Sequence, residues 1–268
     1  MNNTPSRETL LRRLREGRFN DVSSGPGLTA GLTAYSLDIW AELGQRGDLA
    51  GFDWAWDNGA RFTPALGQTL LVQVLTTRQE DLTEVASWLR DHGADLPPPP
   101  PPAEDPVRDR QITTDTLWRL VVDRNPAAIT WLAAQGVPVK FERREAGVLL
   151  SHAVRQHKHD ALPVIEQLVE AGADVRACDE DGENVFHSLA RISVPDDNLV
   201  ARFREIWTYL NQAGADPQAR NRAEESPIDL LDPTQQDFAR ATVRAVQAQP
   251  LDAPAAEVAP RRIRNRRS

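Results

Sequence analysis

The chain has 268 residues, of which 40% are hydrophobic and 26% are charged, and its formal net charge is −8. This length suffices for one large domain or two small ones, and the composition excludes a chain that is membrane-embedded or disordered throughout. No apolar run approaches the roughly 18 residues that span a bilayer, the N-terminus lacks the hydrophobic stretch of a signal peptide, and Cys178 has no partner for an internal disulfide. We therefore expect a cytoplasmic protein without membrane contact.

The first predicted element is a short helix with a polar face over residues 6–17, opened by Ser6. Terminal units of repeat arrays need a polar outer face. We therefore expect residues 1–30 to form an N-terminal cap.

After this segment one sequence pattern recurs five times: apolar residues, two spacer residues, then glycine, usually followed by Ala-Asp. The glycines stand at positions 59, 93, 136, 172 and 214, so the spacings are 34, 43, 36 and 42 residues. Each spacing exceeds a basic period of about 33 by a short insertion. A glycine just past a helix can adopt the left-handed conformation without a Cβ penalty. The pattern predicts a unit of helix, tight turn, helix, glycine and extended loop.

The openings of these units resemble those of the ankyrin-repeat family. Asp181-Gly-Glu-Asn-Val-Phe-His-Ser-Leu-Ala is similar to the family's D-G-x-T-P-L-H-x-A-A, Glu225-Ser-Pro-Ile-Asp-Leu-Leu is similar to a variant opening, and Gly67-Gln-Thr-Leu-Leu fits the same frame. The resemblance covers roughly residues 31–245. It implies an all-α ankyrin-repeat solenoid of five to six helix-turn-helix repeats with long finger loops and terminal capping helices.

On this basis we expect one ankyrin-repeat domain over residues 1–248, followed by a disordered tail over 249–268. The expected repeats are 31–61, 66–95, 113–138, 146–176, 181–216 and a partial sixth over 224–247.

Two insertions interrupt the period. The six prolines Pro97–Pro102 fall where a finger loop lies, and a proline run is a stiff extended spacer. We favour a longer finger over a proline ligand for an SH3-like partner. Residues 191–199 separate the two helices of the fifth repeat and are expected to form an exposed, acidic, mobile loop.

His152, His157, His159 and Asp160 are the one group with the residue types of a metal site. His157 and His159 point apart on a helix, and the segment coincides with an inter-helix turn, so we favour a surface turn. A metal-dependent or catalytic protein built on this cluster is the alternative. His187 occupies the position of the family's histidine, whose ring is implied to hydrogen-bond the backbone between repeats. No nucleophile elbow, phosphate loop or H-E-x-x-H motif is present.

Three tryptophans share one position. Trp54, Trp88 and Trp131 each lie five residues before their repeat glycine, on successive second helices. We favour packing between repeats. The alternative is an aromatic strip on the outer, convex surface that anchors a partner.

The ankyrin resemblance implies a protein-binding module whose concave surface is made of first helices and finger loops. It implies no built-in active site, so we expect a non-catalytic protein with no cofactor and no bound metal. The residues expected to contact the partner are Gln73, Arg119, His152 and Ser188 on first helices, Arg124 and Arg155 near the inter-helix turns, and Arg143, Asp179 and Glu180 in finger loops.

Charge suggests the kind of partner. Residues 251–268 hold five arginines against two carboxylates, so the first 250 residues carry −11. Such a body would steer a basic partner. We therefore expect a toxin-neutralising immunity protein or a secretion-system adaptor. Only two of the 31 basic residues are lysines, an arginine bias that we interpret as a sign of a bacterial gene. The arginine-rich tail could bind nucleic acid, but we expect it to be solvated.

Overall fold

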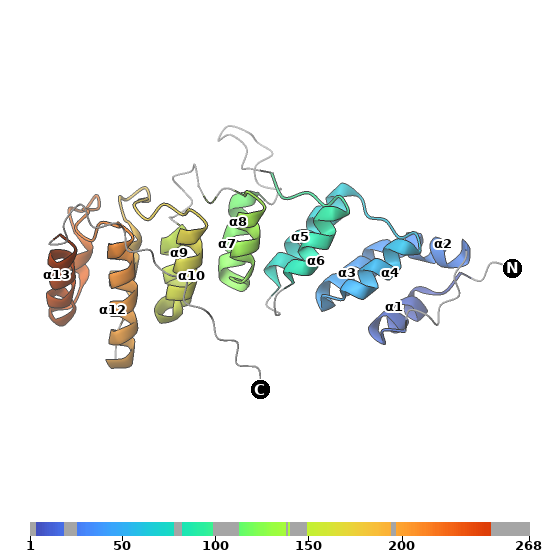
Figure 1. Ribbon diagram of the computed structural model, residues 1–268, viewed down its shortest axis with the longest axis horizontal. Coiled ribbons are helices and arrows are strands. Elements are labelled where there is room, and N and C mark those ends of the chain that lie inside the picture. The colour runs from blue at the N-terminus through green and yellow to red at the C-terminus, as the bar shows by residue number, and fades with distance from the viewer. Residues whose placement is uncertain are drawn as a thin grey trace. The chain divides into compact units, whose positions relative to one another are not determined.

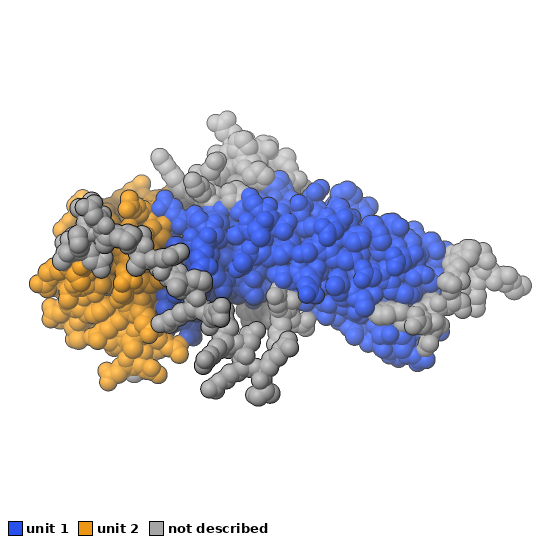
Figure 2. Space-filling view, in the orientation of Figure 1, with its two compact units in different colours: residues 1–174 blue, residues 175–268 orange. Residues whose placement is uncertain are grey.

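The computed structural model describes residues 4–18, 26–77, 82–98, 113–137, 139, 149–193 and 197–247. The C-terminal tail, most of the proline run and Arg143 lie outside these residues. The described residues form thirteen α-helices and two 3-10 helices, and they contain no strand. Contacts divide the chain into two compact units, residues 1–174 and 175–268 (Figure 2). The single array expected from the sequence over residues 1–248 stays a prediction, and each unit is described by itself.

Unit 1 is built from helix pairs that follow one another along the chain (Figure 1). Its elements are α1 (Arg7–Arg15), α2 (Pro26–Ala34), α3 (Ser36–Arg46), α4 (Leu49–Asp57), α5 (Pro64–Thr76), α6 (Thr83–Asp91), α7 (Thr114–Arg124), α8 (Ala128–Ala134), α9 (Leu149–His157), η3 (Lys158–Asp160) and α10 (Leu162–Glu170). The first helices α1, α3, α5, α7 and α9 pack successively against one another. The second helices α4, α6, α8 and α10 each pack against the first helix of their own pair.

Unit 2 continues the same pattern with α11 (Val185–Ala190), α12 (Asp197–Gln212), η4 (Pro227–Leu230) and α13 (Pro233–Gln247). The short first elements α11 and η4 pack together, as do α12 and α13. Since α12 begins at Asp197, residues 197–199 are helical and do not belong to the loop expected over 191–199. The helix α2 of unit 1 likewise crosses the boundary expected at residue 30. The remaining repeat boundaries stay predictions.

Every repeat glycine ends a second helix in the same way. The five glycines have φ between 71° and 97°, in the left-handed region. The backbone N–H after each glycine donates to the carbonyl five residues earlier, as from Ala60 to Ala55 and from Ala215 to Leu210, at 2.9 Å and 3.0 Å. This is the Schellman arrangement, and it confirms that the recurring glycine stops a helix.

Four first elements begin at a small polar residue whose side-chain oxygen accepts a backbone N–H of the first turn. These N-caps are Thr63, Thr113, Asn184 and Ser226. Thr63 and Ser226 are followed by proline at the first helical position, where its missing N–H costs nothing. The opening of the second repeat therefore lies at Thr63, and its expected position at Gly67 is wrong. The threonine of that expected opening, Thr69, is inside α5 and donates its hydroxyl to the Ala65 carbonyl at 2.9 Å.

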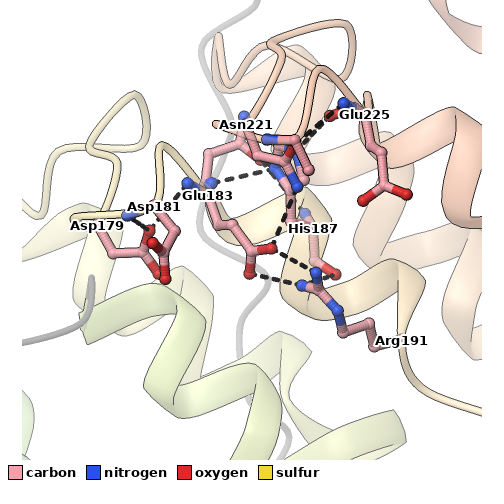
Figure 3. Close-up of polar contacts among 9 residues, drawn as sticks. Asp179, Asp181, Glu183, His187, Arg191, Asn221 and Glu225 are labelled. Atoms are coloured by element: carbon pink, nitrogen blue, oxygen red, sulfur yellow. Dashed lines mark hydrogen bonds and ion pairs between the residues drawn. The ribbon is translucent and has the colours of Figure 1, made fainter.

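Unit 2 contains two equivalent finger turns, residues 179–183 and 221–225 (Figure 3). In the first, Asp179 Oδ1 accepts the N–H groups of Asp181 and Glu183 at 3.0 Å and 2.9 Å. In the second, Asn221 Oδ1 accepts the N–H groups two and four residues on, at 2.9 Å and 3.0 Å. The Arg222 N–H donates to the Asp181 carbonyl at 2.8 Å. One polar side chain thus holds each turn, and a backbone hydrogen bond joins the two.

Two of the three tryptophans in the shared position are buried. Trp88 and Trp131 are 8% and 9% exposed. The Trp88 indole N–H donates to Asp53 Oδ1 at 2.7 Å, and that of Trp131 donates to Ser87 Oγ at 2.8 Å. Each indole therefore reaches the preceding second helix. The alternative expectation, an aromatic strip on the outer surface, is therefore wrong for Trp88 and Trp131, because adjacent helices enclose both side chains. Trp54 on α4 is half-buried.

Trp88 is also the centre of an aromatic cluster in unit 1. Its ring lies 5.0 Å from Phe52 and 6.1 Å from Trp40, and it meets Trp56 edge-on at 5.7 Å. His92 stacks on it with ring centroids 3.7 Å apart. Aromatic pairs of this kind add about 0.5–1.5 kcal/mol beyond their area burial, so the cluster ties α3, α4 and α6 together.

The tryptophan packing predicts a stability effect. Replacing Trp88 with alanine should lower the free energy of unfolding by roughly 3–5 kcal/mol, because removing a buried indole leaves a cavity. Leu37→Ala on α3 is the control, since Leu37 is 62% exposed, and it should change stability by less than about 0.5 kcal/mol. Urea unfolding followed by circular dichroism measures both. Equal stabilities for the two variants would mean that Trp88 is not a core residue.

The two finger turns provide a matched pair of substitutions. Gly182 and Glu224 occupy the same position and have φ of 75° and 61°. A side chain in this conformation costs roughly 1–2 kcal/mol. Gly182→Ala should therefore destabilise unit 2 by about that amount, and Glu224→Gly should stabilise it by up to about 1 kcal/mol, since glycine's chain entropy offsets part of the gain. Thermal unfolding would contradict this if both substitutions shifted Tm in the same direction.

Candidate functional site

Five of the residues expected to contact a partner lie on three adjacent first helices of unit 1. Gln73 is on α5, Arg119 and Arg124 are on α7, and His152 and Arg155 are on α9. Arg124 and Arg155 are exposed, and the other three are half-buried. We call these five side chains the first-helix face.

The structure brings Gln73 and Arg124 together across α5 and α7. With Thr76 and Thr77 they line an open hollow of about 420 Å³. The Thr76 hydroxyl donates to the Val72 carbonyl at 2.8 Å, and the Thr77 hydroxyl donates to the Gln73 carbonyl at 2.7 Å. The hydroxyl hydrogens are therefore used within α5, and their oxygens are left to accept.

A second group connects α7 and α9. The Nε2 atom of His152 lies 2.6 Å from Asp123 Oδ1, and the Nε2 atom of His157 lies 2.6 Å from the Val122 carbonyl oxygen. A carbonyl can only accept, so His157 donates from Nε2. The two imidazoles thus fasten one helix to consecutive residues of the other.

His152 is held in its neutral form. Burial of the ring lowers its pKa most, Asp123 opposes that shift, and the positive charges of Arg119 and Arg155 lower the pKa further. At neutral pH the contact with Asp123 is therefore a hydrogen bond donated by an uncharged ring to a carboxylate. Asp123 was missed by sequence reasoning, because it lies 29 residues from its partner and belongs to no motif.

The expected contact residues of unit 2 have other roles. Ser188 was expected to contact the partner, but it is only 6% exposed, as all six residues of α11 are buried. The carboxylate of Asp179 holds the first finger turn, a role that the sequence analysis did not assign. Glu180 is exposed at the tip of that turn. Asp179 and Glu180 thus share one finger turn, whereas Ser188 is buried.

His187 and Glu183 stabilise the fingers from below (Figure 3). His187 Nδ1 accepts the Asn184 N–H at 3.2 Å, and its Nε2 donates to the Glu225 carbonyl at 3.2 Å. This confirms the backbone hydrogen bond expected for His187. Glu183 forms an ion pair with Arg191, which lowers the pKa of the carboxyl group. Glu183 and Arg191 are eight residues apart in the sequence, and no sequence motif indicated this ion pair.

The alternative of a metal site requires several ligating side chains close together among the described residues. Among them, no three His, Cys, Asp or Glu side chains come close enough together to hold a metal ion. No helix in the described ranges has the length and apolarity to cross a membrane.

No family model matches this sequence, and no curated protein matches it. Among solved structures, the ankyrin repeat domain of human ASB11 matches with a TM-score of 0.52 and 18% identity, over 92% of this chain and 100% of that one. The ankyrin repeat domain of Bcl-3, a member of the IkappaB protein family, matches with a TM-score of 0.51 and 18% identity, over 86% and 97%.

A third structure contains the predatory endopeptidase Bd0816 of Bdellovibrio bacteriovorus in complex with immunity protein Bd3460. It has a TM-score of 0.45 and 15% identity, over 79% of this chain and 98% of that one, and a similarity of this size carries no argument. The helix pairs, the glycine stops and the first two similarities agree on one conclusion: the chain has the ankyrin-repeat fold.

Proposed function

We propose that this protein is a non-catalytic module that binds a partner protein on the first-helix face of unit 1. The observation that carries the proposal is the position of the five side chains of that face on α5, α7 and α9, which pack in succession. Stable protein interfaces bury about 800 Å² on each partner. Polar side chains spread over three parallel helices suit a contact of that breadth better than an enclosed small-molecule site.

The two specific forms expected from the sequence, an immunity protein that neutralises a toxin and a secretion-system adaptor, would both use such a face. The alternative built on His152 to Asp160 has less support. The Nε2 atoms of His152 and His157 are each occupied by a hydrogen bond to α7. Nucleic-acid binding by the arginine-rich tail stays a prediction, because residues 249–268 lie outside the described part of the chain.

A steric block tests this face without changing its charge. Gln73→Trp and Gln156→Trp together place two bulky rings on α5 and α9, where Gln156 is exposed beside Arg155. The partner captured from the source cells by the full chain should be lost from this double variant. The control is Ala50→Trp with Ala134→Trp, at exposed positions of α4 and α8, which should bind as the unmodified chain does.

Both double variants should unfold at the same temperature as the unmodified protein, because all four positions are outside the core. Equal partner binding by the two double variants would contradict the proposed face.

The neutral state of His152 predicts a pH effect on stability. Its folded-state pKa lies below the ordinary value of 6.5, so the folded protein binds the proton less well than the unfolded chain does. Stability is therefore complete above about pH 6.5 and falls as the pH drops through the folded-state pKa. His152→Gln should lose less stability between pH 7 and pH 5 than the unmodified protein. His159→Gln, in η3, should keep the original dependence. Urea titrations at pH 7 and pH 5 measure how much unfolding free energy each protein loses between the two pH values. The same loss for all three proteins would contradict the prediction.

A further inference from the structure

Unit 2 contains a hollow near the C-terminal ends of α12 and α13 that the proposed function does not use. Its volume is about 390 Å³, and it is lined by residues 214–218 of the loop after α12, by Asn211 on α12, by Val243 on α13 and by Arg176. The two helices pack against each other. We call this feature the terminal hollow, because α13 is the last helix among the described residues.

Asn211 points to an occupant of the terminal hollow. It is 6% exposed, and its Nδ2 atom has no hydrogen-bond partner within the described part of the chain. Buried side-chain donors in folded proteins nearly always have an acceptor. Since Asn211 lines the hollow, a segment that enters it can supply the missing oxygen.

The preceding loop shows how such a position is filled. Arg176 stands four residues after the repeat glycine Gly172, and its Nε donates to the Gly214 carbonyl oxygen at 3.1 Å. One loop thus reaches the point where the next second helix ends. Gln218 stands four residues after Gly214, lines the terminal hollow and is exposed. The corresponding place beside Gln218 belongs to the chain that follows α13.

The sequence after α13 is in register with the earlier loop. A period of about 33 residues, counted from Gly214, falls on Gln247, where α13 ends. Gly214 is followed by Ala-Asp-Pro, and Gln247 is followed by Ala-Gln-Pro. The two stretches therefore share the pattern Ala-x-Pro at the same position relative to their helices.

We propose that residues 248–252 of this chain occupy the terminal hollow as a further loop, and that one of their backbone carbonyls accepts the Asn211 side-chain N–H. Pro250 then corresponds to Pro217, which is buried. It would pack against Val243, which is 6% exposed. The inference concerns unit 2 alone and is independent of the first-helix face.

The length of the segment is sufficient for this path. Val243 is four residues before the end of α13, which is about 6 Å along a helix. Five extended residues span about 16 Å, so a chain that turns back after Gln247 reaches Val243 and passes it. The tail expected to be disordered would accordingly begin after residue 252.

Backbone ¹⁵N relaxation of the full chain tests the proposal. Residues 248, 249, 251 and 252 should have order parameters near those of a rigid backbone, about 0.85, whereas residues beyond 258 should fall below about 0.6. Pro250→Ser should lower the values for 248–252 to the level of the far tail. The matched control, Pro254→Ser, makes the same chemical change outside the segment and should leave them as they are.

The side-chain amide signal of Asn211 gives a second readout. It should shift in Pro250→Ser and stay in place in Pro254→Ser, because only the first substitution removes the acceptor. Both prolines follow the packed helices, so circular dichroism should be the same for both variants and for the unmodified protein.

Three outcomes would overturn the proposal. The first is an order parameter below about 0.6 throughout 248–268. The second is an Asn211 signal that does not respond to Pro250→Ser, or that responds equally to both substitutions. The third is ordering of 248–252 that disappears on tenfold dilution, which would assign the hollow to the tail of a second copy of the chain.

Discussion

The whole structure depends on stopping each second helix after a few turns. A helix pair of this size cannot bury its apolar side alone, so it must turn back and place the next pair against itself. The glycine at the end of each second helix makes this turn possible. Its left-handed conformation lets the backbone N–H of the next residue donate a hydrogen bond to the carbonyl five residues before it. Helix ends, finger loops and the alignment of successive pairs all follow from that local geometry.

The sequence revealed the features that are local and periodic. The glycine spacing, the helix pairs and the backbone contact of His187 follow from residues near one another in the chain. The features that the sequence did not reveal are the burial of side chains and the contacts between residues far apart in the chain. Trp88 and Trp131 have the predicted register, but their burial depends on how closely neighbouring helices approach. Ser188 lies on α11, all six residues of which are buried, and the contact between Asp123 and His152 joins residues 29 positions apart in the sequence.

Net charge describes the chain as a whole and not any one of its surfaces. A sum over the chain treats every residue as if one partner met them all, whereas helix pairs place alternate segments on different sides. In unit 1 the first helices carry eight arginines and five carboxylates, whereas the second helices carry one arginine and six carboxylates. The net charge of the whole chain governs the long-range attraction of a partner, whereas the charges of the contact surface govern the contacts made on binding. The two can therefore favour different partners.

The indole hydrogen bonds have a consequence for how such an array changes in length. On α6 the acceptor Ser87 stands immediately before the donor Trp88, and on α4 the acceptor Asp53 stands at the corresponding position. If the pair α5–α6 were deleted, Trp131 would face Asp53 instead of Ser87 and would still find an oxygen. A duplicated copy of that pair would likewise supply one new donor and one new acceptor. The pair is thus a self-contained module, and a gene could gain or lose it by recombination without leaving a buried N–H unpaired.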